Sequence, residues 1–177
     1  MSKAVMLSIR PKWCEKIVNG EKTIEVRKTR PKLQTPFKCY IYCTLPKYPH
    51  EDFIATNYPR PQFYGGGKVI GEFTCDRIDR LAPANEPYGI YDIDDDYVLQ
   101  TCLENGALWD YGHGTPLYGW HIVDLRIYDQ ARELSEFERP YECNECDAKW
   151  ATECNACHEE GKIKRPPQSW CYVEAME

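Results

Sequence analysis

The chain of 177 residues is 42% hydrophobic and 28% charged, which suits one domain with a buried core, or one such domain with a small appendage. No apolar run approaches the ~20 residues of a membrane-spanning helix, and the N-terminal segment lacks the long apolar stretch of a secretory signal. We therefore expect a cytoplasmic protein without membrane contact. The net charge of −6 argues against a protein that grips nucleic acid with its whole surface.

The first predicted elements alternate between strands and one helix. A strand over 4–9 precedes a helix that begins at Pro11, where the missing N–H costs nothing, and ends at Gly20. Alternating apolar and polar residues then predict strands over 23–28 and 37–44.

The second half of the chain is more irregular. After a stretch rich in proline and aromatic residues over 45–67, we expect a strand over 68–76 with a bulge at Gly71. A helix capped by Asp94 runs through about Asn105 and is ended by Gly106. Two further strands are expected over 120–128 and 169–174. Short strands, two short helices and long loops predict a mainly β, α+β fold arranged as a small, partly closed barrel.

The charge is unevenly distributed along the sequence. Residues 1–38 contain ten Lys or Arg and three Asp or Glu, a balance of +7, so the rest of the chain carries −13. A basic N-terminal part on an acidic body indicates a local anionic partner, although a solvated charged surface gives the same pattern.

One segment joins the end of the first helix to the second strand: Gly20-Glu21-Lys22-Thr23-Ile24-Glu25-Val26-Arg27. The period of two places Thr23, Glu25 and Arg27 on one face, and Lys22 stands at the mouth of the turn. An amine, a carboxylate and a guanidinium held together can bind a ligand with donors and acceptors, such as a base edge with its phosphate or sugar. A plain surface strand with an exposed Glu25–Arg27 pair explains the same spacing.

The pattern Gly20-x-Lys22-x-x-Glu25-x-Arg27 resembles the G-x-K-x-x-E-x-R signature of ASCH domains, a branch of the PUA-like superfamily. The segments Ser8-Ile9-Arg10-Pro11-Lys12-Trp13 and Tyr118-Gly119-Trp120-His121-Ile122 also resemble small bacterial and phage ASCH proteins. The resemblance covers most of 4–137 and the final 169–174. It implies a small PUA-like β-barrel with a cleft beside the first helix, and binding of RNA or a nucleotide. We expect the barrel domain to comprise 1–137 with 169–177.

The leading hypothesis is therefore a binding module. Glu25 accepts a hydrogen bond from a base edge. Phosphate and sugar are held by a basic face around Arg10, Lys12, Lys22, Arg27, Lys28 and Arg30. Trp120 either stacks on a base or packs in the core. The candidate binding residues are Arg10, Lys12, Lys22, Thr23, Glu25, Arg27 and Trp120.

The alternative is a small hydrolase of a modified nucleoside. The motif is similar to that of bacterial amidohydrolases that deacylate N4-acetylcytidine, which use a Lys in this motif, a Thr three residues later and a distant Glu. Lys22 matches, Glu25 replaces the Thr, and Glu86 and Glu104 are candidates for the distant Glu. Lys22 and Glu25 are thus catalytic candidates only if the protein is an enzyme. Burial would lower the pKa of Lys22, whereas Glu25 would favour its charged form.

Two C-x-x-C pairs, separated by seven residues, predict a structural zinc site near the C-terminus. Each pair can direct two thiolates at one ion, and the two pairs complete a closed tetrahedral shell with no place for water. The ligands are Cys143, Cys146, Cys154 and Cys157, within an insertion over 141–161. Two disulfides, a redox pair and c-type haem attachment at Cys154-Asn155-Ala156-Cys157-His158 are the alternatives.

The other six cysteines stand singly in apolar or helical patterns. In a reducing cytosol we expect them to be small core residues and not disulfides. They are Cys14, Cys39, Cys43, Cys75, Cys102 and Cys171.

Overall fold

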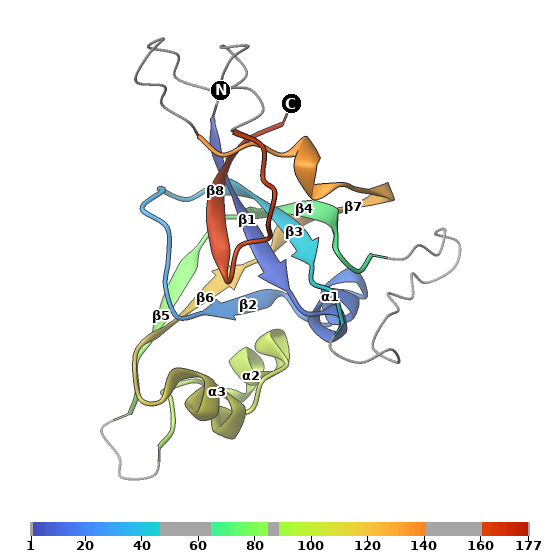
Figure 1. Cartoon of the computed structure of the whole chain (residues 1–177). Coiled ribbons are helices and arrows are strands. Elements are labelled where there is room, and N and C mark those ends of the chain that lie inside the picture. Colours follow the sequence, from blue (N-terminus) through green and yellow to red (C-terminus); the bar gives the residue numbers. More distant parts are fainter. Residues whose placement is uncertain (1, 47–64, 85–88, 141–160, 177) are drawn as a thin grey trace.

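The computed structural model describes residues 2–46, 65–84, 89–140 and 161–176 (Figure 1). The larger of its two sheets has five strands in the order β7-β4-β3-β1-β8. β1 pairs in parallel with β3, and the other neighbours are antiparallel. The bounds of these strands are β1 (Lys3–Ile9), β3 (Phe37–Cys43), β4 (Lys68–Cys75), β7 (Val123–Arg132) and β8 (Trp170–Glu174).

The smaller sheet has three antiparallel strands in the order β2-β6-β5. Their bounds are β2 (Ile24–Arg27), β5 (Ile78–Leu81) and β6 (Leu117–His121). Only Ile122 separates β6 from β7, yet the two strands belong to different sheets. Within the described ranges the strands form two sheets and no closed barrel, so the barrel prediction is wrong in this respect. The predicted strand over 120–128 spans the point where the chain changes sheets, close to Asp124 with its positive φ of 51°.

Three α-helices and a short 3-10 helix complete the described elements: α1 (Pro11–Val18), α2 (Asp95–Thr101), α3 (Asn105–Gly112) and η2 (Leu134–Glu136). The start at Pro11 and the Asp94 cap are confirmed, since the Asp94 carboxylate accepts a 2.8 Å hydrogen bond from the Tyr97 N–H. The single helix predicted through Asn105 is two helices, because Cys102 takes a left-handed conformation with φ 54° and ends α2. Gly106 lies inside α3 and does not end a helix.

Apolar layers cover both faces of the three-stranded sheet. On one face, Trp120 and Ile78 pack with side chains of the five-stranded sheet. On the other face, Val26 and Leu117 pack against side chains of α2 and α3, which lie below this sheet in Figure 1. All four residues of β2 are consequently buried. Glu25 is paired with Trp120 across β2 and β6, so the charged residues of β2 face the space between the two sheets.

Two further predictions concern local features of the core. The bulge expected at Gly71 is confirmed, because the registers of β4 with β3 and with β7 shift beside this residue. A Cβ at Gly71 would lie 2.5 Å from the Arg126 carbonyl oxygen, so the close approach of β7 requires glycine. All six described cysteines are free thiols; four are buried and two are half-buried, namely Cys102 and Cys171. No helix in the described part of the chain is long and apolar enough to span a bilayer.

Candidate functional site

A tight turn delivers the charged residues of the motif. Gly20 adopts a φ of 76°, which lets the chain reverse after α1, and the N–H groups of Glu21 and Lys22 both donate to the Lys16 carbonyl. The Thr23 N–H then donates to the Gln100 carbonyl of α2 at 2.9 Å. The turn is thus fastened to α1 on one side and to α2 on the other before β2 begins.

Lys22, Glu25 and Arg27 form a buried charged triad. The Lys22 Nζ lies 3.4 Å from one carboxylate oxygen of Glu25, and an Arg27 Nη lies 2.9 Å from the other. The three residues are 2%, 6% and 7% exposed, respectively. The sequence prediction that these groups converge is therefore met, but the groups are enclosed by the fold and do not form an exposed surface pair.

Backbone carbonyls from distant parts of the chain satisfy the two cations. Lys22 donates to the Thr101 carbonyl at 2.6 Å, and Arg27 donates to the carbonyls of Ser8 at 2.8 Å and Ser169 at 3.3 Å. These bonds join β2 to the end of α2, to β1 and to the segment before β8. The Arg27 Nε is buried and has no hydrogen-bond partner in the described structure.

Burial dominates the protonation equilibrium of Lys22. Removal from water lowers the pKa of its amine, and the attraction of Glu25 only partly opposes this effect. The indole ring of Trp13 lies 5.2 Å from the same ammonium group and provides a further favourable contact for the charged form. The site therefore holds an amine that releases its proton more readily than an exposed lysine.

A cavity of about 510 Å³ opens above this triad. Its walls come from the end of β1, from α1, from α3 and from the segment before β8. The polar and aromatic side chains that line it include Arg10, Lys12, Trp13, Tyr111, Gln168 and Ser169, with Lys22, Glu25 and Arg27 at its base. Arg10 and Lys12 are exposed to solvent, so the cations of the pocket lie both at its mouth and in its interior.

Most of the predicted binding residues meet in this pocket. Arg10, Lys12, Lys22, Glu25 and Arg27 all line it. Thr23 does not; it sits in the turn, where its N–H and carbonyl hold Gln100 and Ile122 by backbone hydrogen bonds.

Trp120 also differs from the binding prediction. Its side chain is fully buried, and its ring packs edge-on against Phe37 at 5.8 Å and beside Trp170 at 6.0 Å. Its place in the layer between the two sheets makes it a core residue and removes it from the pocket wall. The aromatic rings that do line the pocket belong to Trp13 and Tyr111. Nothing in the local sequence pattern separates Tyr111 from the other tyrosines.

A second charged cluster lies at the β5 side of the three-stranded sheet, where the His121 ring packs against Tyr97 of α2 at 6.5 Å. His121 lies 2.6 Å from Asp79, and the Arg77 guanidinium lies 3.1 Å from the same carboxylate. His121 has no evident acid–base partner in the sequence, and the pairing of β5 with β6 supplies one. The Arg77 side chain is 64% exposed, so this cluster is in contact with water.

The predicted zinc ligands, Cys143, Cys146, Cys154 and Cys157, lie outside the described residues, as does Glu86. Within the ranges that the structure describes, no group of three or more His, Cys, Asp or Glu side chains could hold a metal ion. Glu104 precedes α3, is exposed and does not line the pocket. The zinc site stays a prediction, and the described residues offer no glutamate other than Glu25 in the pocket.

Comparison with known proteins agrees with this architecture. The family model of the ASCH domain matches residues 7–173. The crystal structure of ASCH from Zymomonas mobilis is 19% identical and superposes with a TM-score of 0.57, covering 97% of this chain and 87% of that chain. A tyrosine-to-phenylalanine mutant of the same protein gives a TM-score of 0.58 at 19% identity, covering 98% of this chain and 91% of that chain. No curated protein matches the chain. Because the family model spans nearly the whole sequence, this protein belongs to the ASCH domain family.

Proposed function

We propose that this ASCH domain binds RNA or a nucleotide in the pocket above Lys22, Glu25 and Arg27. ASCH domains are generally RNA-binding proteins with a PUA-like fold. The observation that carries the proposal is a cavity of about 510 Å³ with cations at its mouth, a carboxylate between two cations at its base and aromatic rings in its walls. Its volume lies within the range of small-molecule sites.

The polar groups of the pocket match the parts of a nucleotide. Arg10 and Lys12 are exposed at the mouth and are suited to phosphate, whereas Glu25 is an acceptor that suits the amino group of a base such as cytosine. Trp13 and Tyr111 offer flat apolar surfaces for a base or sugar. The pocket thus provides separate places for the charged and the flat parts of the ligand.

A binding experiment tests this assignment. We expect Arg10→Ala to lower the affinity for cytidine or uridine 5′-monophosphate on the order of fivefold, because the variant loses one phosphate contact. The matched control is Arg126→Ala, since Arg126 is also an exposed arginine and lies on β7. Isothermal titration calorimetry of parent and variants measures the effect. Equal affinity of the parent and Arg10→Ala, or no binding by the parent of either a monophosphate or a short RNA, would reject the proposed pocket.

The lowered pKa of Lys22 favours a second candidate, an amidohydrolase of an N4-acylated cytidine. Water would add across the amide bond and release cytidine and the carboxylic acid, with neutral Lys22 as the base. Turnover of N4-acetylcytidine by the parent, lost in Lys22→Met, would support this activity. Absence of product at high protein concentration would exclude it for this substrate and leave the binding proposal standing.

We also propose that Cys143, Cys146, Cys154 and Cys157 bind one structural Zn²⁺ ion. The spacing of the two C-x-x-C pairs supports this, and the free state of all six described cysteines fits a reducing cytoplasm, where we place the protein. Metal analysis of the purified protein should give one zinc per chain, and Cys146→Ser should remove it. Full zinc content in that variant would contradict the site.

A further inference from the structure

The segment that connects β2 with β3 carries an unusual density of positive charge. No Asp or Glu occurs between Glu25 and Glu51, while the net charge of the whole chain is −6. Lys28, Arg30 and Lys32 of this segment are all exposed. Arg80 of β5 is exposed as well, and its register partner is Tyr118, so the two share a face of the small sheet. We refer to Lys28, Arg30, Lys32 and Arg80 as the basic strip.

Aromatic side chains lie beneath this segment and contact every second residue of it, namely Lys28, Arg30 and Lys32. The Lys28 ammonium lies 5.0 Å from the ring of Tyr111, and the Arg30 guanidinium lies 5.9 Å from the ring of Tyr118. The Lys32 N–H donates to the Tyr172 hydroxyl at 2.8 Å. The irregular segment is thereby fixed in place through the backbone at Lys32, while the cationic groups of Lys28 and Arg30 lie over aromatic rings.

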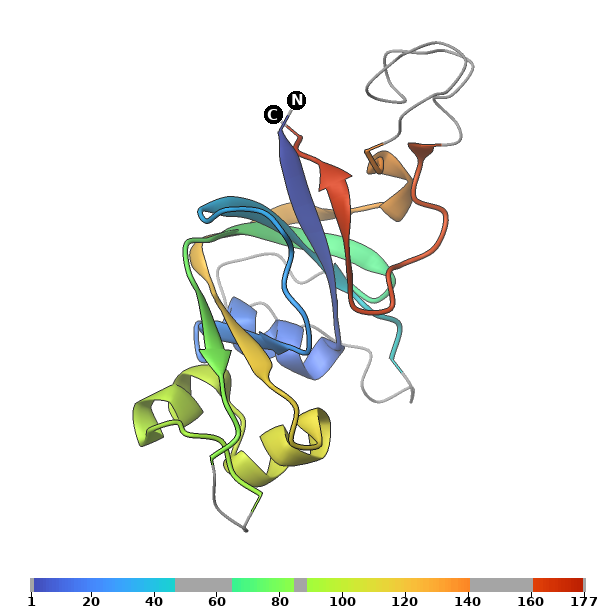
Figure 2. The ribbon, with the colours of Figure 1, turned by 90° about the vertical axis from the view of Figure 1, so that its left-hand side faces the viewer.

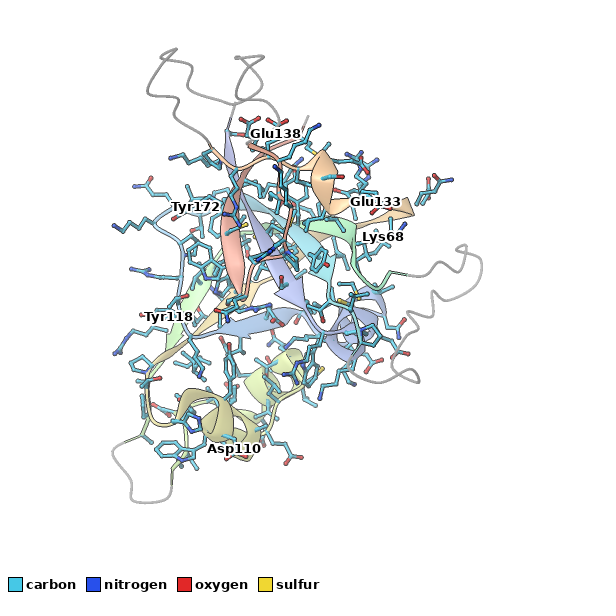
Figure 3. All side chains as sticks on the ribbon, in the orientation of Figure 1. Lys68, Asp110, Tyr118, Glu133, Glu138 and Tyr172 are labelled. Carbon is cyan, nitrogen blue, oxygen red and sulfur yellow. The ribbon has the colours of Figure 1, made fainter. Side chains whose placement is uncertain are left out.

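The figures show that this arrangement follows one side of the molecule. Figure 2 looks onto this side, where the blue segment after β2 runs along the outside from the small sheet to the large one. In Figure 3, Tyr118 and Tyr172 both lie on this side, at the lower and the upper end of the segment. The strip therefore crosses the edge at which the two sheets meet.

Within the part of the chain that the structure describes, the cations of the strip lack the carboxylate partners that several other surface cations have. In the described structure Lys16, Lys38 and Lys68 each pair with a glutamate; Lys68 and Glu133, 2.7 Å apart, are labelled in Figure 3. None of the ion pairs within the described ranges involves a residue of the basic strip. Like charges held close together without counter-charges attract a polyanion.

The strip begins at the wall of the pocket. Tyr111 lines the cavity on one side and contacts Lys28 on the other, and Ser169 of the cavity directly precedes Trp170, whose indole N–H donates to the Thr29 hydroxyl at 2.9 Å. A chain of phosphates that leaves the pocket past Tyr111 thus meets Lys28 first and Arg30 next. Alternating cations and aromatic rings are the features by which proteins hold single-stranded nucleic acid.

We propose that the basic strip is the track of a single-stranded RNA, one nucleotide of which occupies the pocket. This inference rests on the proposed function of the pocket and specifies its partner as a polynucleotide. A free nucleotide would leave the cations of the strip without a ligand. The strip meets the RNA through cations that contact phosphates, so we expect it to tolerate different bases.

The test compares ligands of different length by fluorescence polarisation. We expect a labelled oligouridylate of about eight nucleotides to bind the parent on the order of tenfold more tightly than the labelled mononucleotide. About three phosphate contacts should give a slope near −2 in a plot of log affinity against log salt concentration. The triple variant Lys28→Ala, Arg30→Ala, Lys32→Ala should reduce the octanucleotide affinity to that of the mononucleotide and bring the slope close to the slope of the mononucleotide.

The controls separate the strip from the pocket. Arg126→Ala should leave both affinities unchanged, and the triple variant should bind the mononucleotide like the parent. The proposed RNA track would be rejected, and the pocket retained, if parent and triple variant bound the octanucleotide equally well. The same would follow if the parent bound an oligoglutamate of similar charge as tightly as the octanucleotide. Loss of octanucleotide binding in the triple variant together with no effect of Arg10→Ala would instead support the strip and reject the pocket.

Discussion

Two charged clusters of the same small sheet differ in their surroundings more than in their composition. Lys22, Glu25 and Arg27 on the β2 side are between 2% and 7% exposed. Arg77, which precedes β5, Asp79 of β5 and His121 of β6 also combine basic side chains with one carboxylate, but the Arg77 side chain is 64% exposed and that of Asp79 is 31% exposed. The first cluster is enclosed by α2 and by the segment before β8. In the second, His121 is largely covered, because its ring packs against Tyr97 of α2 at 6.5 Å, but the Arg77 and Asp79 side chains reach solvent.

The comparison shows that the fold, not the residue types, decides what a charged cluster can do. In the buried triad water cannot solvate the ions, so each ion depends on its partner and on backbone carbonyls. In the exposed cluster water replaces a lost partner at little cost. Only the buried triad therefore combines a perturbed pKa with a cavity, which is the combination expected of a functional site.

The largest expected effect follows from removing the shared carboxylate. Glu25→Ala leaves the Lys22 and Arg27 cations buried beside each other without an anion, and we expect it to lower the free energy of unfolding by about 3–5 kcal/mol. Urea unfolding at neutral pH measures the loss. The double variant Glu25→Ala with Lys22→Met should recover part of the stability, because one uncompensated charge is removed. If the single variant loses less than about 1 kcal/mol of unfolding free energy, the triad is solvated like the exposed cluster.

A smaller effect, with a defined pH dependence, is expected for Lys22→Met. The variant leaves the Thr101 carbonyl without its donor, at a cost of about 1–3 kcal/mol at neutral pH, and Glu25 keeps its pair with Arg27. Because burial lowers the pKa of Lys22, the unfolded chain binds more protons than the folded chain between that lowered value and the ordinary value near ~10.4. The parent therefore gains stability from Lys22 as the pH rises through this window, by at most about 1.4 kcal/mol per pH unit. The variant lacks this gain.

The titration of buried thiols changes the free energy of unfolding in the opposite direction, so its contribution has to be subtracted from the effect of Lys22. Burial raises the pKa of Cys75 to about 12, so above about pH 8.5 the unfolded chain loses a proton that the folded chain keeps, and stability falls. Parent and Lys22→Met share this fall. The difference between their unfolding free energies, measured under reducing conditions from pH 7 to about pH 10, thus isolates Lys22 and should grow with pH. A constant difference would mean that the Lys22 pKa is not lowered.

The sequence predicted the local arrangement of the triad but not its burial. The spacing of Lys22, Glu25 and Arg27 depends on a helix end and on the period of two in a strand, both of which are local. Their burial depends on Thr101 and Ser169, which are 79 and 142 positions from their partners Lys22 and Arg27. No local pattern reports such distant contacts, and an exposed Glu–Arg pair would have the same spacing.

The errors in the predicted fold have the same origin. Alternation alone could not show that the chain changes sheets at Ile122, nor that Trp120 faces the layer between them. Glycine commonly ends helices, so Gly106 was predicted to end this one. The left-handed residue that ends α2 is instead Cys102, and cysteine is an unusual residue type for that conformation. The starts of α1 and α2 were predicted correctly, because Pro11 and the Asp94 cap mark them locally.

The smallest expected change in stability belongs to the exposed cluster of Arg77, Asp79 and His121. Asp79→Asn keeps the size of the side chain and removes the ion pair with Arg77 and the carboxylate that contacts His121. Since water reaches these side chains, we expect the free energy of unfolding to fall by less than about 1 kcal/mol, and the loss to shrink further in high salt.

Urea unfolding of the parent, Asp79→Asn and the isosteric Glu25→Gln at low and high salt gives the three values side by side. The variant at Glu25 should lose several times more stability, with little dependence on salt, because buried pairs are screened far less than exposed ones. Equal losses in the two variants would mean that burial does not distinguish these clusters, and the pocket would then have no special electrostatic character.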